Sequence, residues 1–367
     1  MHSSAVLCAG KNTVATGNAA PRFRVENPRS HADWDARFSS QPHFSFFHSA
    51  AWAGVLQRTY GFTPVYITAT CGNQPRSLLP MMEVDSWLTG KRGVSLPFTD
   101  HCEPLGFSET GSGAVIEEAL RQGRTRGWKY MECRSDPAMA GGFNGAPPSL
   151  SFFGHRLDLI PDTDALFVRF EGSVRRAIRK AEKSGLIVEI AQTLPALHAY
   201  YSLHCKTRKQ HGQPPQPFGF FRNIQEEILA RDLGVVISAK HNGRAVASAV
   251  FFHTPSEAIY KFGASDNAFQ DLRANNLVMW EAIKWCARKG IKTLDFGRTS
   301  IANEGLRRYK LGWGAEEYPI HHYKYDLRRN EFVTDKDAAS GWHVRAFGAL
   351  PVFLARIVGA VLYKHVG

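Results

Sequence analysis

The feature that most constrains the fold is one strand-and-helix pattern that occurs twice along the chain. In the second half, VVISAKHNGRAVASAVFF (residues 235–252) reads as a strand, a turn at Asn242-Gly243 and a second strand. Asn-Gly between two apolar runs is the strongest local signal of a β-hairpin. A third strand over 258–264, a helix over 277–289 and a returning strand over 291–296 are expected to follow.

The first half repeats this order. We expect strands on both sides of a Gly-Asn turn within residues 64–84, then a helix over 117–126 and a strand over 128–134. Each helix stops at a glycine, Gly127 or Gly290, the residue type that best adopts the left-handed backbone after a helix. Two such units predict an α/β (α+β) protein with two domains of one type.

The length of the chain agrees, because 367 residues exceed one ordinary hydrophobic core. We expect a flexible N-terminus over residues 1–20, a first domain over 21–155, a second domain with the active site over 156–335 and an amphipathic C-terminal tail over 336–367. The N-terminus lacks the apolar run of a signal peptide.

A formal net charge of +12 indicates anionic partners, such as phosphorylated ligands, nucleic acid or a membrane surface. The alternative is an ordinary basic protein that binds none of these. The 6 cysteines form no Cys-x-x-Cys pair, so the pattern predicts neither a zinc site nor a disulfide framework and fits a reducing cytosol. We expect no metal.

The apolar segment LPVFLARIVGAVLYKHVG closes the chain and is interrupted by Arg356. It is shorter than a membrane-spanning helix requires. Two interpretations stay open: an amphipathic helix on a membrane surface, or a terminal helix docked on the protein's own core. The predicted location is cytoplasmic, with peripheral contact at the inner face of the membrane through this tail.

Between the two repeats lies a helix with one strongly basic face. Val174, Ile178 and Ala181 follow helical spacing on its apolar side. Its polar side is densely cationic and includes Arg175, Arg176, Arg179 and Lys180. The segment predicts an anion-binding site, and a merely solvated face is the alternative.

The next segment, HCKTRKQHGQPPQP, is a helix end followed by a loop that proline excludes from helix and central strand. With His211 and the aromatic residues after the loop it is a candidate wall of a ligand cleft. A packed connector is the alternative.

Candidate catalytic residues gather in LDFGRTSIANEGLRRYKLGWGAEEYP (residues 294–319). A fixed cation such as Lys310 suits the oxyanion that develops when an amine attacks an ester or thioester, where one donor lowers the barrier by roughly 3 kcal/mol. Asp295 is a candidate to accept the proton of the amine or to form a structural ion pair with Arg298. The guanidinium of Arg298 suits a phosphate or carboxylate on the acceptor.

These segments, in this order, resemble the FemAB family, whose members transfer amino acids onto peptidoglycan precursors. The resemblance implies tandem GNAT-like acyl-CoA N-acyltransferase domains, each a mostly antiparallel sheet flanked by helices. It also implies that Tyr309-Lys310 and Trp313 lie in the acceptor cleft of the second domain. The loop LPFTDHCEPLG is similar to a family loop and makes Asp100 a further candidate base, and Tyr260 is a further candidate for substrate contact.

The chain is most similar to FemAB-like proteins associated with exopolysaccharide and PEP-CTERM/exosortase loci. It departs from acetyl-CoA-dependent relatives at FQDLRANNLVMW, where the glycines that cradle pyrophosphate are absent. The donor therefore stays open between acyl-CoA and aminoacyl-tRNA.

The resulting hypothesis is an N-acyl or aminoacyl transferase acting on an amine of an anionic small molecule or glycan precursor in envelope or exopolysaccharide biosynthesis. Two alternatives remain: an acetyl-CoA-dependent GNAT N-acetyltransferase, and a non-catalytic RNA- or membrane-surface-binding protein on the same fold.

Overall fold

The computed structural model describes residues 22–71, 74–106, 109–135, 143, 145–334, 347 and 350–365. The predicted flexible N-terminus, the Gly-Asn turn at residues 72–73 and most of the tail before residue 350 lie outside these ranges. No helix within them is both long enough and apolar enough to cross a bilayer.

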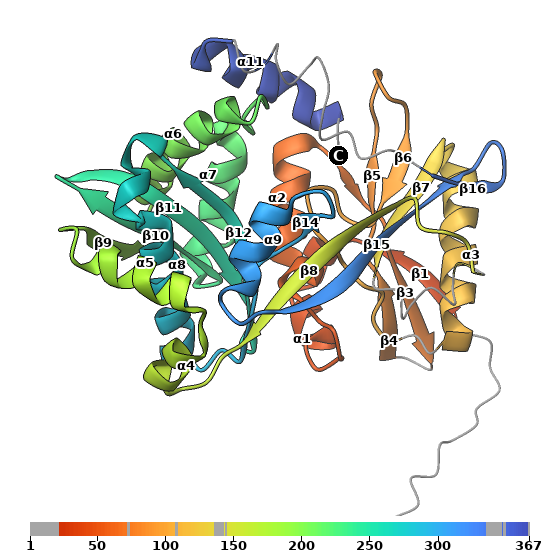
Figure 1. The fold of residues 1–367 in the computed structure, drawn as a ribbon. Coiled ribbons are helices and arrows are strands. Elements are labelled where there is room, and N and C mark those ends of the chain that lie inside the picture. Colours follow the sequence, from red (N-terminus) through yellow and green to blue (C-terminus); the bar gives the residue numbers. More distant parts are fainter. Residues whose placement is uncertain are drawn as a thin grey trace, which may run out of the picture.

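In the first half, helices lie on both sides of the strands (Figure 1). Its elements are β1 (Arg22–Glu26), α1 (Trp34–Phe38), α2 (Ala50–Tyr60), β2 (Thr63–Pro64), β3 (Tyr66–Cys71), β4 (Gln74–Leu79), β5 (Met82–Val84), β6 (Arg92–Val94), α3 (Glu109–Arg126) and β7 (Tyr130–Ser135).

The second half and the tail follow. Their elements are β8 (Leu150–Asp158), α4 (Thr163–Arg169), α5 (Gly172–Glu182), β9 (Ile187–Ala191), α6 (Leu194–Gln210), α7 (Phe218–Glu227), β10 (Gly234–His241), β11 (Arg244–His253), β12 (Glu257–Ser265), α8 (Ala274–Arg288), β13 (Thr293–Asp295), β14 (Thr299–Ser300), α9 (Glu304–Leu311), β15 (Glu316–Asp326), β16 (Glu331–Val333), α11 (Val352–Leu362) and the 3-10 turn η6 (Tyr363–His365).

The predicted repeat is confirmed. β5 and β6 are antiparallel and β6 is parallel to β7 across the α3 crossover, just as β11 and β12 are antiparallel and β12 is parallel to β13 across α8. The turn between β10 and β11 has φ of 49° at Asn242 and 76° at Gly243, as an Asn-Gly hairpin requires. Gly127 and Gly290 both have positive φ after their helices.

One prediction within the first repeat was too short. The helix expected over 117–126 begins at Glu109. Gly111 and Gly113 weaken the helical signal there, but the burial of Val115 and Ile116 supplies the packing that outweighs intrinsic propensity.

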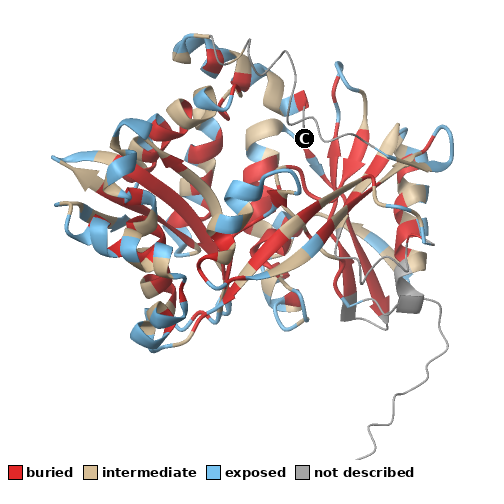
Figure 2. Ribbon diagram, in the orientation of Figure 1, coloured by how far each residue is buried: buried red, intermediate tan, exposed pale blue. Residues whose placement is uncertain are grey.

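The two halves share one sheet. Its strand order is β2-β5-β6-β7-β15-β8-β13-β12-β11-β10-β9, and β15 pairs with β7 of the first half and with β8. The boundary expected between residues 155 and 156 falls inside β8. One hydrophobic cluster also combines residues of both halves, including Trp52, Leu56, Phe220 and Phe252. Figure 2 shows buried positions running through both parts of the sheet.

Strands β12 and β13 diverge after a short stretch of pairing. β12 and β13 pair only from Glu257↔Thr293 to Ile259↔Asp295. Beyond Ile259, β12 continues to Ser265, whereas the chain after Asp295 turns away into the loop that carries Arg298. This divergence leaves backbone and side chains of β12 facing the loop instead of a neighbouring strand.

Candidate active site

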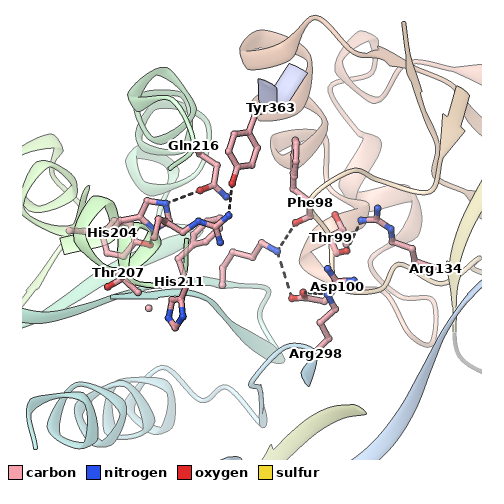
Figure 3. A pocket seen from close by; sticks show the side chains of 15 residues that line it. Phe98, Thr99, Asp100, Arg134, His204, Thr207, His211, Gln216, Arg298 and Tyr363 are labelled. Carbon is pink, nitrogen blue, oxygen red and sulfur yellow. Dashed lines mark hydrogen bonds and ion pairs between the residues drawn. The ribbon is translucent and has the colours of Figure 1, made fainter. Parts of the chain in front are cut away.

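A cavity of about 500 Å³, which we call the interdomain pocket, receives side chains from both halves. Segment 98–100 and Arg134 come from the first half, while the end of α6, β12 and the loop after β13 come from the second. Tyr363 of η6 adds a wall from the C-terminal tail (Figure 3). The pocket is thus assembled from segments far apart in the sequence.

Asp100 lies between two cations in this pocket. Its carboxylate is 3.6 Å from Lys261 Nζ and 3.7 Å from Arg298 Nε. Burial acts to raise the pKa of Asp100, but the charges of Lys261, Arg298 and Lys310 together bring that pKa below its usual value. Asp100 is therefore an anion at neutral pH, suited to hold an ammonium group and weak as a proton acceptor.

Lys261 was not predicted as a site residue. It occupies a bulge in β12, because Phe251 pairs with Tyr260 while Val250 pairs with Phe262. A bulge redirects a side chain, and the Lys261 ammonium donates a 2.7 Å hydrogen bond to the carbonyl of Phe98. Burial lowers the pKa of Lys261, and Asp100 opposes that effect. The sequence signal was a single lysine within an otherwise apolar strand, AIYKFGA.

The segment that carries Asp100 is held in an unusual backbone conformation. Leu96 and Phe98 have φ of 60° and 59°, a region that side chains other than glycine rarely adopt. Arg134 braces it by donating to the carbonyls of Leu96 at 3.2 Å and Thr99 at 2.9 Å. These contacts fix the position of Asp100 relative to β12.

The loop after β13 is fixed equally firmly, and Asp295 takes part in this. One Asp295 oxygen accepts a hydrogen bond from the Gly297 amide, and the other accepts from the Tyr318 hydroxyl, both at 2.5 Å. Asp295 is 2% exposed. Both carboxylate oxygens are thereby used to support the loop.

Lys310 supports the same loop from α9. Its ammonium donates to the carbonyl of Gly297 at 2.7 Å and to the carbonyl of Arg298 at 3.1 Å. Burial lowers the pKa of Lys310 to about 8, while Asp100 and Asp295 act to raise it. Lys310 is 2% exposed and does not line the interdomain pocket. It acts on that pocket through its charge and through the loop it holds.

The α6 side of the pocket combines cations with neutral polar groups. His204 shares hydrogen bonds with Tyr200 and Gln216, and burial lowers its pKa to about 3, so its ring is neutral. Arg208 donates to the Tyr363 hydroxyl at 2.5 Å. His211, predicted from sequence, also lines this wall (Figure 3).

A second cavity, which we call the basic groove, holds about 550 Å³ between α5, α9 and the start of α8. Its cations are Arg176, Lys180, Arg273 and Arg308, and Glu171 is its acid. Tyr309 lines this groove, while its neighbour Lys310 faces the loop of Arg298. Helix α9 therefore lines the basic groove and also contacts the loop that carries Arg298.

Other residues that were predicted from the sequence line neither the interdomain pocket nor the basic groove. Trp313 is fully buried and packs edge-on against Phe170 at 5.2 Å, so it belongs to the core. Tyr260 packs against Phe251 on β11. Arg179 lies over the ring of Phe167 at 5.5 Å.

Arg175 belongs to the same predicted basic face. It is only partly exposed and does not line the basic groove, unlike Arg176 and Lys180. Of the basic residues predicted on α5, Arg176 and Lys180 therefore line the groove, whereas Arg175 and Arg179 do not.

Comparison with known proteins agrees with this description. The acetyltransferase (GNAT) domain family matches residues 169–311. A lipid II:glycine glycyltransferase of Staphylococcus haemolyticus (strain JCSC1435) is 33% identical over 99 residues, which are 25% of this chain and 24% of that protein. The chain thus matches about a quarter of that relative's length.

Two solved structures share the fold. The crystal structure of FemX has a TM-score of 0.64 at 14% identity and covers 82% of this chain and 96% of that one. A tandem GNAT protein from the clavulanic acid biosynthesis pathway has a TM-score of 0.55 at 11% identity, over 84% of this chain and 99% of the other. These likenesses bear out the expected tandem GNAT-like fold.

Proposed function

Because this chain belongs to the FemAB/GNAT family of acyltransferases, we propose that it transfers an acyl or aminoacyl group to the amine of a cell-envelope precursor. More specifically, we propose that this precursor is used in exopolysaccharide assembly. The observation that carries the proposal is the Asp100 carboxylate, held between Lys261 and Arg298 in the interdomain pocket.

The pocket suits an acceptor that carries both an amine and an anionic group. Asp100 holds the ammonium form of the acceptor, while Arg298 and Arg208 offer donors to its phosphate or carboxylate. The glycyltransferase relative is named for its action on lipid II. A lipid-linked precursor with anionic phosphates fits the same charges, and we propose that class of acceptor.

The donor occupies the basic groove in this proposal. Four cations line the groove, and both acyl-CoA and aminoacyl-tRNA carry phosphates. At the start of α8, where GNAT enzymes carry glycine, this chain has Arg273, Ala274 and Asn275. Side-chain cations therefore take the place of a backbone phosphate cradle, and we favour aminoacyl-tRNA as the donor.

The reaction balances without a redox partner. The acceptor ammonium first loses one proton to solvent, and the neutral amine then attacks the ester or thioester carbonyl; a C–N bond forms, and the C–O or C–S bond breaks. The second proton, which the nitrogen loses as the amide forms, ends on the departing hydroxyl or thiol. We assign Lys310 the role of positioning Gly297 and Arg298 and of stabilising the oxyanion through its charge, and Asp295 the role of holding the same loop.

The test is to incubate the purified protein with aminoacyl-tRNA or acetyl-CoA and an amine-bearing lipid-linked precursor, and to detect the amide by mass spectrometry. We expect product with the wild type and strongly reduced product with Asp100→Asn. Product with acetyl-CoA alone would assign the second candidate, an acetyl-CoA-dependent N-acetyltransferase.

The exposed cations of the basic groove also favour a non-catalytic alternative, an RNA-binding protein on this fold. That alternative predicts RNA binding that weakens steeply with salt, together with no amide product from any donor. Such a result would contradict the proposed transferase.

A further inference from the structure

Helix α11 buries its small residues and exposes its large apolar ones, the reverse of an ordinary surface helix. Ala355 and Gly359 face the protein and are buried. A Cβ at Gly359 would lie 1.9 Å from the Pro215 carbonyl oxygen, so the helix sits directly on the proline-rich loop. On the other side, Phe353, Ile357 and Val361, spaced four residues apart, are 64%, 59% and 52% exposed.

A second element extends this surface. Trp87 is 82% exposed and its neighbour Leu88 is 53% exposed, in the loop between β5 and β6. The Trp87 ring contacts His365 of η6 with ring centroids 5.4 Å apart. We call Trp87, Leu88, Phe353, Leu354, Ile357 and Val361 the apolar face.

The loop and the tail are joined rigidly. The His365 carbonyl accepts hydrogen bonds from Thr89 Oγ1 at 3.0 Å and from an Arg92 nitrogen at 2.9 Å, and the His365 ring shares a 3.0 Å hydrogen bond with Ser86 Oγ. In Figure 1 α11 and the β5–β6 loop lie along the same edge of the molecule. The two parts of the apolar face therefore lie at one edge of the molecule and are held together at His365.

The charge beside this face is positive. Residues 351–365 contain Arg356 and Lys364 and no acidic residue, and both cations are exposed. In the β5–β6 loop, the carboxylate of Asp85 lies 3.5 Å from Lys91 Nζ. Large apolar side chains, an exposed tryptophan and flanking cations are the features of a surface that enters the headgroup region of an anionic bilayer.

We propose that the apolar face docks this protein on an anionic lipid membrane. The docked tail is also part of the interdomain pocket, because the Tyr363 hydroxyl donates to the Pro214 carbonyl at 3.1 Å and accepts from Arg208. Docking thereby holds the pocket beside the bilayer. A pocket beside the bilayer could receive a lipid-linked acceptor, and this part of the inference rests on the proposed function. Membrane binding itself does not rest on it.

The test is co-sedimentation of the full chain with vesicles of phosphatidylglycerol and phosphatidylcholine, without donor or acceptor. We expect the wild type to sediment with these vesicles more than with pure phosphatidylcholine. The double variant Phe353→Glu, Ile357→Glu should lower the partition coefficient roughly tenfold or more, because it places charge in the headgroup–acyl boundary. Val168→Glu, at a 67% exposed site on α4, is the matched control and should bind like the wild type.

A second measurement does not depend on how the double variant folds. Lipids brominated in the acyl chain should quench tryptophan fluorescence of the wild type, and Trp87→Phe should remove most of that quenching. Wild-type protein that stays in the supernatant, or a double variant that binds as well as the wild type, would overturn the proposal.

Sedimentation equilibrium without lipid tests whether a second copy of the chain, and not a membrane, covers the apolar face. A dimer that Ile357→Glu dissociates would assign the apolar face to a second copy of the chain instead. Because none of these assays contains a donor or acceptor, a failure of membrane binding and a failure of the proposed transfer reaction are separate results.

Discussion

The ammonium of Lys310 donates a 2.7 Å hydrogen bond to the backbone carbonyl of Gly297, so a lysine of α9 holds the turn that follows β13. The same ammonium donates to the carbonyl of Arg298, whose side chain lines the interdomain pocket. Sequence chemistry pointed to Lys310 as a group that meets substrate. Lys310 is buried, and its ammonium contacts the backbone of the loop, so we propose that it positions this loop and that its charge acts on the pocket.

Replacing Lys310 with methionine should destabilise the fold and impair transfer. The change leaves the buried carbonyl of Gly297 and the partly buried carbonyl of Arg298 without this donor, and the loss at a buried group costs about 1–3 kcal/mol. Chemical denaturation measures the first effect and single-turnover transfer the second. Lys240→Met is the control, since Lys240 pairs with Glu189 on the far edge of the sheet. Wild-type stability in Lys310→Met would contradict the buried contacts.

The pKa of Lys310 also predicts a pH dependence of stability. Burial lowers this pKa from 10.5 to about 8 in the folded protein. Between these values the unfolded chain binds a proton that the folded protein lacks, so this group makes stability rise with pH, by at most ~1.4 kcal/mol per pH unit. Below pH 8 the group contributes no slope. Denaturation from pH 7 to 10 should show the rise for the wild type relative to Lys310→Met, and parallel curves for the two proteins would refute it.

Gly297→Ala should disturb the site from the opposite side. Gly297 has φ of 71°, and an added Cβ would lie 2.9 Å from an Asp100 oxygen. We expect a loss of about 1–2 kcal/mol in stability from the backbone alone and a fall in kcat/KM from the displaced Asp100. Gly305→Ala is the matched control, because the nearest atom to its added Cβ is 3.9 Å away and the site is helical. The control should be neutral or slightly stabilising; equal effects of the two changes would argue against the special position of Gly297.

Asp100→Asn should lower kcat/KM by about a hundredfold, a typical effect of removing one charged group that contacts the reacting atoms. The change removes the anion that holds the acceptor amine and leaves Lys261 and Arg298 facing one another without it. Thermal unfolding is needed beside the kinetics, because loss of one member of a partly buried ion pair also destabilises. Asp33→Asn, at an exposed aspartate before α1, should leave transfer unchanged. An Asp100→Asn enzyme that is folded and fully active would remove Asp100 from the site.

Arg308→Glu should weaken donor binding without affecting the acceptor. Arg308 lines the basic groove with three other cations, so a reversed charge repels donor phosphates. Titration with aminoacyl-tRNA at several salt concentrations should show a weaker affinity and a shallower salt dependence than the wild type. Arg24→Glu, at an exposed position of β1 in the other half, is the control. If both variants lose affinity equally, net charge and not the groove determines binding.

Much of the fold was predictable because its signals are local. The Asn242-Gly243 hairpin and the glycines that end α3 and α8 are set by backbone preferences over a few residues. The length of α3 was not predictable in this way, since Gly111 and Gly113 weaken the local signal while the burial of Val115 and Ile116 favours the helix. The same holds for the site. Asp100, Arg298 and His211 were predicted from the sequence, and all three line the interdomain pocket. Lys261 was missed because a bulge in β12, which the sequence does not reveal, directs its side chain into the pocket.

By itself the sequence determined the repeated strand-and-helix units and the basic character of α5. It also placed Asp295 at the end of β13, with Arg298 and Lys310 after that strand. Only the tertiary structure decided that Asp295 and Lys310 support the loop from inside, that Trp313 is core, and that Asp100 of one half faces Lys261 and Arg298 of the other. The physical reason is that spacing along the chain fixes local geometry, whereas burial and charge pairing depend on which distant segments a shared sheet brings together.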